Sequence, residues 1–509
     1  MLSVLSMLIL VQQTLRAETI SQRLEKKDNI SLATNTNTYR FNYPSVDSNG
    51  QPIVLSAGVA VWNPSDSDEK QIETILIANH STFTQNSQSP SLYEYFGLPT
   101  NEIGMLYSIV GTNAKKYPQL GRCLMIMPDY EGYGVSADRP HPYMILDLSA
   151  RQVTDAVDYG LKLYQKAVEE GECLPLSKNW KSFCIGYSQG AAISLAVQRY
   201  MEQNGLVDKY HLAGSCCGDG PFDIVSTINY YLNDDGDSYG VKTNHKKREC
   251  KLPITIALTF NSICTQMPEM RQHRISDYVS KKFLDTGIIQ MINSKELSIG
   301  DVKKAFYKMC QDGLKAADGT VYTAAEIRKM FPVASSSILG TDLIGDMKEI
   351  LTPACFEYMN NPENTRETPT DGFGDPMKDL HRALAANTFT NDGWEPQLPI
   401  SLFHSKHDEV VPYDNYLKFA ESHPFARIRH TVHCSQSHVL SGVDYFALLT
   451  TNGEAVEHIR WIAEEATTGI KSKKAKQADS KYHDLNGRNT DSMPRKGFYI
   501  HLNKKFFTK

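Results

Sequence analysis

The pentapeptide GYSQG at residues 186–190 has the glycine–serine–glycine spacing of a nucleophile elbow. Such an elbow is a sharp turn between a strand and a helix that exposes the serine hydroxyl. Its glycines are needed because a Cβ there would collide with the neighbouring strand or helix. Apolar residues 182–185 precede the motif, and Ala191 and Ala192 follow it as small residues that open a helix. This context favours Ser188 as a nucleophile over a serine in an ordinary tight turn.

An acidic residue should come next along the chain, followed by a histidine, if Ser188 belongs to a catalytic triad on this kind of elbow. Asp408 lies on a loop directly after the apolar segment 400–404. A loop at the carboxyl end of a strand is where ligand-facing groups of an open α/β sheet belong. Glu409 is the adjacent alternative, whereas Asp414 is better placed to cap the next helix. We therefore predict Asp408 as the triad acid.

The histidine is chosen from His423, His430, His433 and His438, which all follow Asp408. His430 lies in an alternating segment typical of a strand, so a role as a strand residue suffices for it. His438 lies in a loop that opens the last predicted helix, from which an imidazole can reach the elbow. We predict His438 as the base and keep His433 as the alternative.

These residue types predict acyl transfer through a covalent intermediate. His438 would take the proton of Ser188 and pass it to the leaving group, while Asp408 holds the imidazole in the required tautomer. Water would then release the acyl-enzyme. The oxyanion needs two backbone N–H donors, for which we predict the amide of Gln189 and that of His80 or Ser81, in the loop after the apolar segment 75–78.

Short apolar strands alternate with helical patterns in two blocks, which predicts an α/β-hydrolase fold with a mostly parallel central sheet flanked by helices. Strands are predicted at residues 53–62, 75–79, 123–127, 182–185, 400–404 and 427–431, and helices at 149–167, 191–203 and 415–422, with one more before residue 466.

Between the two blocks the pattern changes to short amphipathic helices without clear strands. Because the sheet pattern resumes afterwards, we predict a large inserted helical cap rather than a separate domain. The predicted organisation is a signal peptide at 1–17, the hydrolase core at 18–228 and 396–466, the cap at 229–395, and a linker with a C-terminal tail at 467–509.

Several segments resemble the secretory lipase family of α/β hydrolases. They are MPDYEGYG at 127–134, LDLSAR at 146–151, GDGPFD at 218–223, the elbow itself, and the loop residues 80–82 and 90–91. The resemblance implies an ester hydrolase, a lipase or esterase, that acts on a small-molecule or lipid ester and carries a lid over its acyl pocket. The cap does not share the resemblance, so the acyl and alcohol preferences stay open.

Both ends of the chain suggest export to the cell surface or outside the cell. The apolar stretch at residues 2–11 has the length of a signal-peptide h-region. Residues 482–488 (YHDLNGR) and 494–500 (PRKGFYI) resemble the C-terminal sorting tail of Gram-negative proteins secreted by the type IX route. The resemblance implies secretion machinery as a partner, and the Asn-Gly pair suits a tight β-hairpin. In an exported protein, one or two disulfide bridges are expected among the ten cysteines.

Other functions find little support. A net charge of −5 gives no reason to expect nucleic acid, and no apolar run is long enough for stable membrane insertion. Asn233, Asp235 and Asp237 lack the glycine and glutamate of a calcium loop, and His404 with His407 are too few for zinc. No phosphate-binding or dinucleotide-binding glycine pattern is present, so we expect no metal and no cofactor.

Two other functions share the predicted fold. A serine peptidase of the prolyl-peptidase type would need room for a β-propeller that the N-terminal region does not have. An inactive hydrolase-fold surface binding protein would commonly lack one of Ser188, Asp408 and His438.

Overall fold

The computed structural model describes residues 19–27, 35–64, 70–94, 101–111, 115, 118–243, 245–337, 340–390, 392–433, 437–450 and 457–464, together with the strands at 482–484, 489–490, 497–501 and 504–508. The predicted signal peptide at 1–17 lies outside the described residues. Two compact units are distinguished, Met1–Ala463 and Glu464–Lys509. Each is described by itself.

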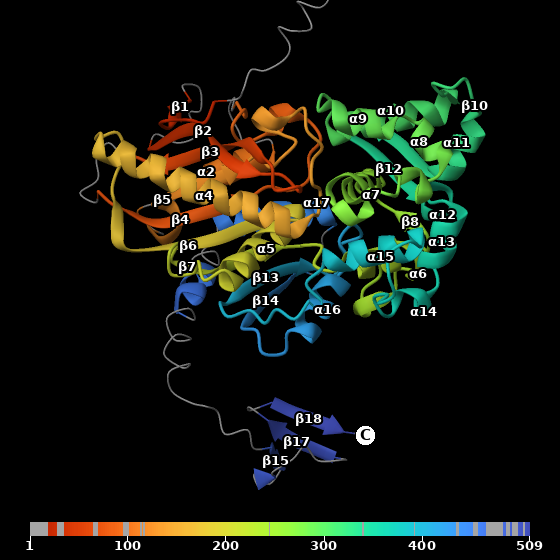
Figure 1. Ribbon diagram of the computed structural model, residues 1–509. Coiled ribbons are helices and arrows are strands. Elements are labelled where there is room, and N and C mark those ends of the chain that lie inside the picture. The colour runs from red at the N-terminus through yellow and green to blue at the C-terminus, as the bar shows by residue number, and fades with distance from the viewer. Residues whose placement is uncertain are drawn as a thin grey trace, which may run out of the picture. The chain divides into compact units, whose positions relative to one another are not determined.

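The larger unit is built on a nine-stranded sheet with the order β1-β2-β3-β5-β4-β6-β7-β13-β14 (Figure 1). The first three strands and the β3–β5 pair are antiparallel, and every pair from β5 to β14 is parallel. The prediction of a mostly parallel sheet flanked by helices is therefore confirmed. The bounds are β1 (Glu25–Lys26), β2 (Thr36–Val46), β3 (Pro52–Trp62), β4 (Ile72–Asn79), β5 (Cys123–Pro128), β6 (Leu176–Tyr187), β7 (Leu212–Gly218), β13 (Ile400–Ser405) and β14 (Ile428–His433).

All six predicted strands are present, but β1, β2 and β7 were not among the predicted strands. In β2 the buried residues Tyr39, Phe41 and Tyr43 alternate with more exposed ones. This period of two is the signal that identifies a half-buried strand. Strands β1 and β2 extend the antiparallel edge, whereas β7 lies between β6 and β13 and pairs in parallel with both.

Helices α4 (Leu146–Glu169) and α5 (Gln189–Gln203) lie side by side across the sheet (Figure 1). Buried residues of α4 recur at helical spacing, as in Ala150, Val153 and Val157, so that one face packs inward. Helix α17 (His438–Thr450) packs on β13 and on α2 (Glu102–Ile109), and α16 (Asp414–Ser422) lies between β13 and β14 in the chain. This arrangement brings residues more than 200 positions apart to one edge of the sheet.

The long insert between β7 and β13 carries most of the remaining helices and occupies one side of the larger unit (Figure 1). They are α6 (Ile224–Asn233), α7 (Ile254–Gln266), α8 (Lys281–Asp285), α9 (Ile288–Ser294), α10 (Ile299–Asp312), α11 (Ala324–Met330), α12 (Met347–Ile350), α13 (Pro353–Met359), α14 (Pro362–Thr365) and α15 (Pro376–Ala386).

The expectation that this insert has no clear strands is wrong. Strands β11 (Val333–Ser337), β12 (Gly340–Asp346) and β8 (Glu249–Cys250) form a three-stranded sheet, and β9 (Leu314–Lys315) pairs with β10 (Val321–Tyr322). Three of these strands have only two residues, and β11 reads VASSS. Such strands offer too few apolar residues to show a period of two, which is why the sequence pattern missed them.

Most of the cysteines that the structure describes in the larger unit are buried thiols. Every cysteine that the structure describes is free, so the expected one or two bridges are not found among these residues. Cys216 and Cys217, in β7, are both buried, as their apolar surroundings predict.

The smaller unit contains a four-stranded antiparallel sheet with the order β16-β15-β17-β18. The strands are β15 (Tyr482–Asp484), β16 (Asn489–Thr490), β17 (Gly497–His501) and β18 (Lys504–Thr508). Hairpins are what the tail's sequence predicts, whereas its role as a sorting signal stays a prediction.

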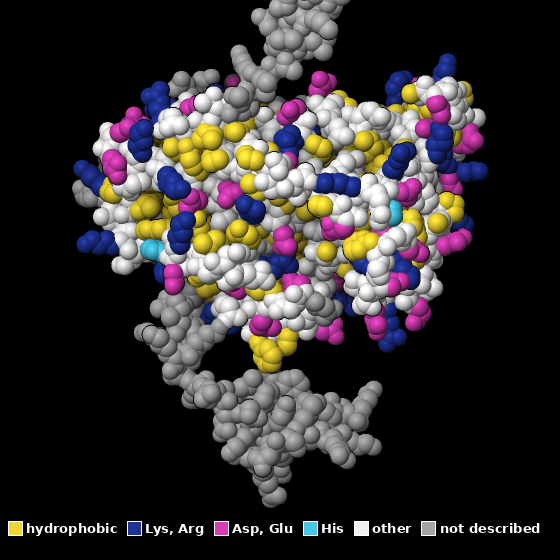
Figure 2. Space-filling model, in the orientation of Figure 1, with side chains coloured by type: hydrophobic (Ala, Val, Ile, Leu, Met, Phe, Trp, Pro, Cys, Tyr) yellow, Lys and Arg dark blue, Asp and Glu magenta, His cyan; other side chains and the backbone are white. Residues whose placement is uncertain are grey.

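On the visible face of the larger unit, basic and acidic side chains are intermixed rather than gathered by sign (Figure 2). Among the described residues, no helix combines the length and the apolar character that crossing a membrane requires.

Candidate active site

Ser188 occupies the turn between β6, which ends at Tyr187, and α5, which begins at Gln189. Its backbone has φ 55° and ψ −122°, a conformation that a non-glycine residue holds only under strain. A Cβ on Gly186 would lie 2.3 Å from the Gly190 carbonyl oxygen, and one on Gly190 would lie 2.0 Å from that of Asn79. The glycines thus let the turn sit against β4, which is the reason for their spacing in the sequence.

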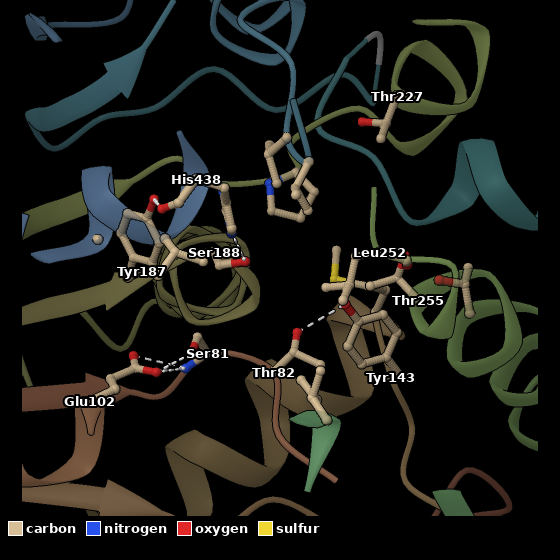
Figure 3. A pocket seen from close by; sticks show the side chains of 18 of the residues that line it. Ser81, Thr82, Glu102, Tyr143, Tyr187, Ser188, Thr227, Leu252, Thr255 and His438 are labelled. Carbon is tan, nitrogen blue, oxygen red and sulfur yellow. Dashed lines mark hydrogen bonds between the residues drawn. The ribbon is translucent and has the colours of Figure 1, made fainter. Parts of the chain in front are cut away.

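Ser188, His438 and Asp408 form a hydrogen-bonded chain (Figure 3 shows the first two). His438 Nε2 lies 2.9 Å from Ser188 Oγ, and His438 Nδ1 lies 2.6 Å from Asp408 Oδ2. The other carboxylate oxygen of Asp408 accepts from the amides of Val410 and Val411 at 2.9 and 2.7 Å. Three elements supply the three groups: the elbow, the loop after β13, and the first residue of α17.

The alternatives that the sequence left open are placed elsewhere or stay undecided. Glu409 does not take the hydrogen bond of His438 Nδ1, which goes to Asp408. The ring of His430 stacks on Tyr416 with centroids 3.5 Å apart. His433 ends β14, and its side chain is outside the described part of the chain.

Charges around His438 favour its protonated form. Burial opposes protonation, but the charge and hydrogen bond of Asp408, followed by Asp219 and Glu409, outweigh it and raise the pKa of His438 to about 9. A histidine with an Asp partner of this kind holds the proton of the nucleophile readily once the reaction begins.

In the loop after β4, where the amide of His80 or Ser81 was predicted as an oxyanion donor, the amide of Ser81 is already engaged. The amide of Ser81 already donates to both carboxylate oxygens of Glu102, at 2.9 Å each, and the Ser81 hydroxyl donates to Glu102 as well (Figure 3). The His80 ring contacts the Ser81 and Asp129 carbonyl oxygens and stacks on Phe83. These contacts hold the His80 side chain in a packed setting.

Two backbone amides near Ser188, the predicted donor Gln189 and also Thr82, are not taken up by other hydrogen bonds in the described part of the chain. Gln189 directly follows Ser188, and Thr82 directly follows Ser81. Thr82 lines the same cavity as Ser188, and its hydroxyl pairs with Tyr143 at 3.0 Å (Figure 3). Sequence reasoning missed Thr82 because adjacent loop residues carry no signal of where their amides point.

Glu102 is a second group that the sequence did not reveal. It opens α2, lines the cavity beside Ser188 and His438, and is only partly exposed. Loss of solvent around its carboxyl raises its pKa to about 7, against the hydrogen bonds from Ser81 and the charge of His438. A neutral or anionic group therefore lies beside the nucleophile, depending on pH.

The segment 127–134, which carried part of the family resemblance, holds the loop after β4 in place. Tyr130 donates its hydroxyl to the His80 carbonyl at 3.2 Å, and Tyr133 donates to the Phe83 carbonyl at 2.6 Å. Asp129 accepts from the Ser91 amide at 2.8 Å and from the Ser56 hydroxyl at 2.5 Å. These contacts are buried and tie the loop to β5.

An apolar cavity of about 430 Å³ opens over Ser188. Its walls come from both the core and the insert, and most of the side chains are aliphatic or aromatic. They include Met105, Tyr143 and Met144 near the sheet, Ile224, Ile228 and Tyr231 on α6, Leu252, Ile256 and Phe260 at and on α7, and Val439, Val443 and Phe446 on α17. Apolar walls with a few polar groups at one end are typical of a small-molecule site.

Several solved structures share this fold. The chain has a TM-score of 0.56 and 15% identity to a rice cell wall degrading esterase LipA from Xanthomonas oryzae, covering 90% of this chain and 100% of that one. It has a TM-score of 0.50 and 16% identity to a hydrolase from Legionella pneumophila, covering 87% and 91%. Candida antarctica lipase A in its closed state gives a TM-score of 0.50 and 12% identity, covering 90% and 92%.

No protein-family model matches the chain, and the search of curated proteins gives no match. The structural likenesses agree with the sheet order and show that the chain has the α/β-hydrolase fold with an insertion. At these identities they establish the fold alone.

Proposed function

We propose that this chain is an exported carboxylic ester hydrolase of the secretory lipase type, with Ser188, His438 and Asp408 as its catalytic triad. The observation that carries the proposal is the hydrogen-bonded chain from Asp408 through His438 to Ser188, which ends in an apolar cavity of about 430 Å³. The fold shared with lipase and esterase structures supports the ester as the bond attacked.

In the proposed reaction, His438 Nε2 accepts the hydroxyl proton as Ser188 Oγ attacks the ester carbonyl. Asp408 stabilises the resulting imidazolium through its 2.6 Å hydrogen bond, and in the neutral ring it keeps the proton on Nδ1 so that Nε2 can accept. The imidazolium then protonates the departing alcohol, and an acyl-enzyme remains. Water activated by His438 attacks that acyl group and frees Ser188.

For the oxyanion we propose the amides of Gln189 and Thr82. Both are free of other hydrogen bonds within the described residues, whereas the amide of Ser81 is held by Glu102. Preorganised amides at this position lower the energy of the tetrahedral intermediate, and each donor contributes about 2.7–4 kcal/mol in enzymes of this chemistry. Glu102 would then fix the loop so that the Thr82 amide points into the cavity.

The substrate we propose is a small-molecule or lipid ester with an apolar acyl group. Apart from Glu102, Lys303 and His438, the side chains that line the cavity are uncharged, and those on α6, α7 and α17 are mostly aliphatic or aromatic. Burying an unpaired charge there would cost free energy, whereas burying a hydrocarbon chain is favourable.

Hydrolysis of a p-nitrophenyl ester series from acetate to palmitate, with wild type beside Ser188→Ala, tests the proposal. We expect hydrolysis by the wild type and a loss of about 10⁴-fold or more in Ser188→Ala. The preferred chain length separates a lipase from a short-chain esterase. A folded wild-type protein that hydrolyses no ester of the series would refute the proposal, and peptide substrates would be tried next.

Export rests on the sequence of the two ends. We propose that residues 1–17 direct the chain out of the cytoplasm and that the tail, which forms β15 to β18, is read by secretion machinery. Removing residues 467–509 should keep the enzyme active while it no longer reaches the medium or the cell surface. Unchanged export without the tail would contradict this role.

A further inference from the structure

A second buried carboxyl, Asp219, lies directly behind the triad. It follows β7, has no exposed surface, and has a left-handed backbone with φ 41°. One oxygen of Asp219, one of Asp408 and one ring nitrogen of His438 all lie within 4.8 Å of one another. Two ionised carboxylates this close in a buried site repel each other strongly, so the protonation of Asp219 matters for the triad.

The Tyr187 hydroxyl makes two short contacts, one with Asp219 and one with His438, but has only one hydrogen to donate. Tyr187 Oη lies 2.5 Å from Asp219 Oδ2 and 2.6 Å from the His438 carbonyl oxygen. A phenol has one hydrogen, and a carbonyl oxygen can only accept. If Tyr187 donates to Asp219, the oxygens of Tyr187 and His438 face each other at 2.6 Å without a proton between them. If Tyr187 donates to His438, Asp219 must supply the proton of the other contact.

The remaining contacts of Asp219 are ones in which it accepts, and the second arrangement accommodates them. Its Oδ1 accepts from the Ser405 amide at 2.7 Å, which the carbonyl oxygen of a neutral acid can do as well as a carboxylate oxygen. The Ser441 hydroxyl donates to Oδ2. The result is a continuous chain in which Ser441 donates to Asp219, Asp219 to Tyr187, and Tyr187 to the main chain of His438.

We infer that Asp219 is a protonated carboxylic acid at neutral pH and a positioning residue, which holds the backbone of His438 against the nucleophile elbow through Tyr187. This inference rests on the proposed function for its catalytic meaning. Tyr187 immediately precedes Ser188, and His438 is the first residue of α17, so the tether fixes the base relative to the nucleophile. Asp219 does not line the cavity over Ser188.

The Tyr187 ring, which links Asp219 to the backbone of His438, has little free space around it. A Cβ on Gly218 would lie 2.7 Å from the Tyr187 ring, and one on Gly442 would lie 2.9 Å from it (Figure 3 shows Tyr187 beside His438). The ring therefore fits between β7 and α17 only because both positions are glycines. Its hydroxyl is thereby held between Asp219 and His438.

The charges that face Asp219 are His404, Asp408 and His438. Burial comes first and, with the charge of Asp408, raises the pKa of Asp219 despite the two histidines. A neutral Asp219 also keeps His438 usable as a base. Part of what raises the pKa of His438 to about 9 is the charge of Asp219, and without it more of the imidazole is unprotonated near neutral pH.

Thermal unfolding tests the protonation without any substrate. Asp219→Asn has the same shape, donates N–H from the Oδ2 position and cannot ionise. A carboxyl whose pKa is raised by folding contributes its full stabilisation of the folded state at pH values below its pKa in the unfolded chain, about 3.9. This contribution is lost as the pH rises from there toward the pKa in the folded state. The melting temperature of Asp219→Asn should therefore gain on wild type from about pH 4 to pH 7.

Asp223→Asn is a matched control, because both oxygens of Asp223 act as acceptors, from the Ser226 amide and the Thr390 hydroxyl. It should show no such gain with pH. If the difference in melting temperature between Asp219→Asn and wild type stays constant with pH, or if wild type gains on Asp219→Asn as the pH rises, Asp219 is ionised and the inference is overturned.

Kinetics on a p-nitrophenyl ester test the positioning role. Asp219→Asn should keep kcat/KM within about threefold and leave its acid limb in place, whereas Tyr187→Phe should lower kcat by roughly 10- to 100-fold with little change in KM. An Asp219→Asn variant in which the acid limb falls by about one pH unit or more would show that an anionic Asp219 supports His438, and would overturn the inference. If the wild type hydrolyses no ester, the proposed function fails, while the unfolding data still decide the state of Asp219.

Discussion

The cavity is lined by the carboxyl ends of the parallel strands, called the sheet edge below, and by the insert. The sequence encodes these two regions very differently. At the sheet edge, the positions of Ser188 and Asp408 follow from local turns, each directly after a buried strand. In the insert, Ile228, Ile256 and Phe260 face the cavity from helices whose sequences show only that one side is apolar. A turn encodes its own geometry, whereas the direction in which a helix presents its apolar side depends on its neighbours.

Chemistry and substrate selection are also divided between the two regions. Groups at the sheet edge would carry out bond making and breaking, and the insert would decide which acyl group fits. Substitutions at the edge should therefore abolish turnover for every ester, while substitutions in the insert should change the order of preference among esters.

The largest effect is expected at the acid. Asp408→Asn should lower kcat about 10⁴-fold because the imidazole loses its charged partner and its tautomer is no longer fixed. Glu409→Gln should retain at least about one tenth of the activity, since Glu409 does not accept from His438 Nδ1. Steady-state kinetics on one ester checks both. Equal losses in the two variants would contradict the assignment of Asp408.

The two histidines that the sequence left open give a second large contrast. His438→Ala should lose about 10³-fold or more in kcat, whereas His433→Ala should stay within about tenfold of wild type. Circular dichroism would show that both variants are folded. Loss of activity in His433→Ala alone would move the base to β14 and break the link between α17 and the elbow.

A third effect is the pH dependence of kcat/KM. His438 must be unprotonated to act as base, and Asp408 holds the pKa of His438 above its ordinary value of 6.5, toward about 9. Activity should therefore rise about tenfold per pH unit on the acid side and level off only above neutral pH. Rates measured from pH 5 to 10 on a substrate that does not titrate check this. An acid limb below pH 6.5 would contradict the charge arrangement around His438.

A moderate effect is expected in the insert. Ile256 is a buried residue of α7 that lines the cavity, so Ile256→Trp should fill part of the 430 Å³. We expect kcat/KM for long-chain esters to fall about tenfold while acetate is hydrolysed at nearly the wild-type rate. Competition between acetate and decanoate esters measures the change directly. An equal loss on both esters would show that the insert also shapes the chemistry.

The smallest effect concerns stability within the insert. Ser298 caps α10 by accepting from the Asp301 amide at 3.2 Å, in a reciprocal capping box with Asp301. Ser298→Ala should lower the free energy of unfolding by about 1 kcal/mol and leave kcat unchanged. Denaturant titration measures the loss.

Ser294→Ala is the matched control for this cap. Ser294 is the exposed last residue of α9, where its hydroxyl donates to the Met291 carbonyl, accepts from the Glu296 amide at 3.3 Å and caps no helix N-terminus. The expected change in the free energy of unfolding is below about 0.5 kcal/mol. Equal losses in Ser294→Ala and Ser298→Ala would show that the cap of α10 adds nothing beyond an ordinary surface hydroxyl.

Much of the sheet edge could be predicted because its signals are local. The strand before Ser188 and the helix after it are visible within a short stretch of chain, and Asp408 follows a strand of its own. His438 was chosen on chain order and on its place before a helix, and the structure brings it within 2.9 Å of Ser188. The small sheets of the insert were missed because strands of two residues carry no period.

Short-range patterns in the chain were enough for the mostly parallel sheet, the strained turn at Ser188 and the order of the acid and the histidine, because strand periodicity and glycine spacing act over short distances. Only the tertiary structure determines that Glu102 accepts a hydrogen bond from the Ser81 amide, and that the Thr82 amide makes no hydrogen bond within the described residues. It likewise brings Asp219 to Tyr187 behind the triad. Such contacts join residues from separate elements, and the burial and charge that set their chemistry exist only once the chain has folded.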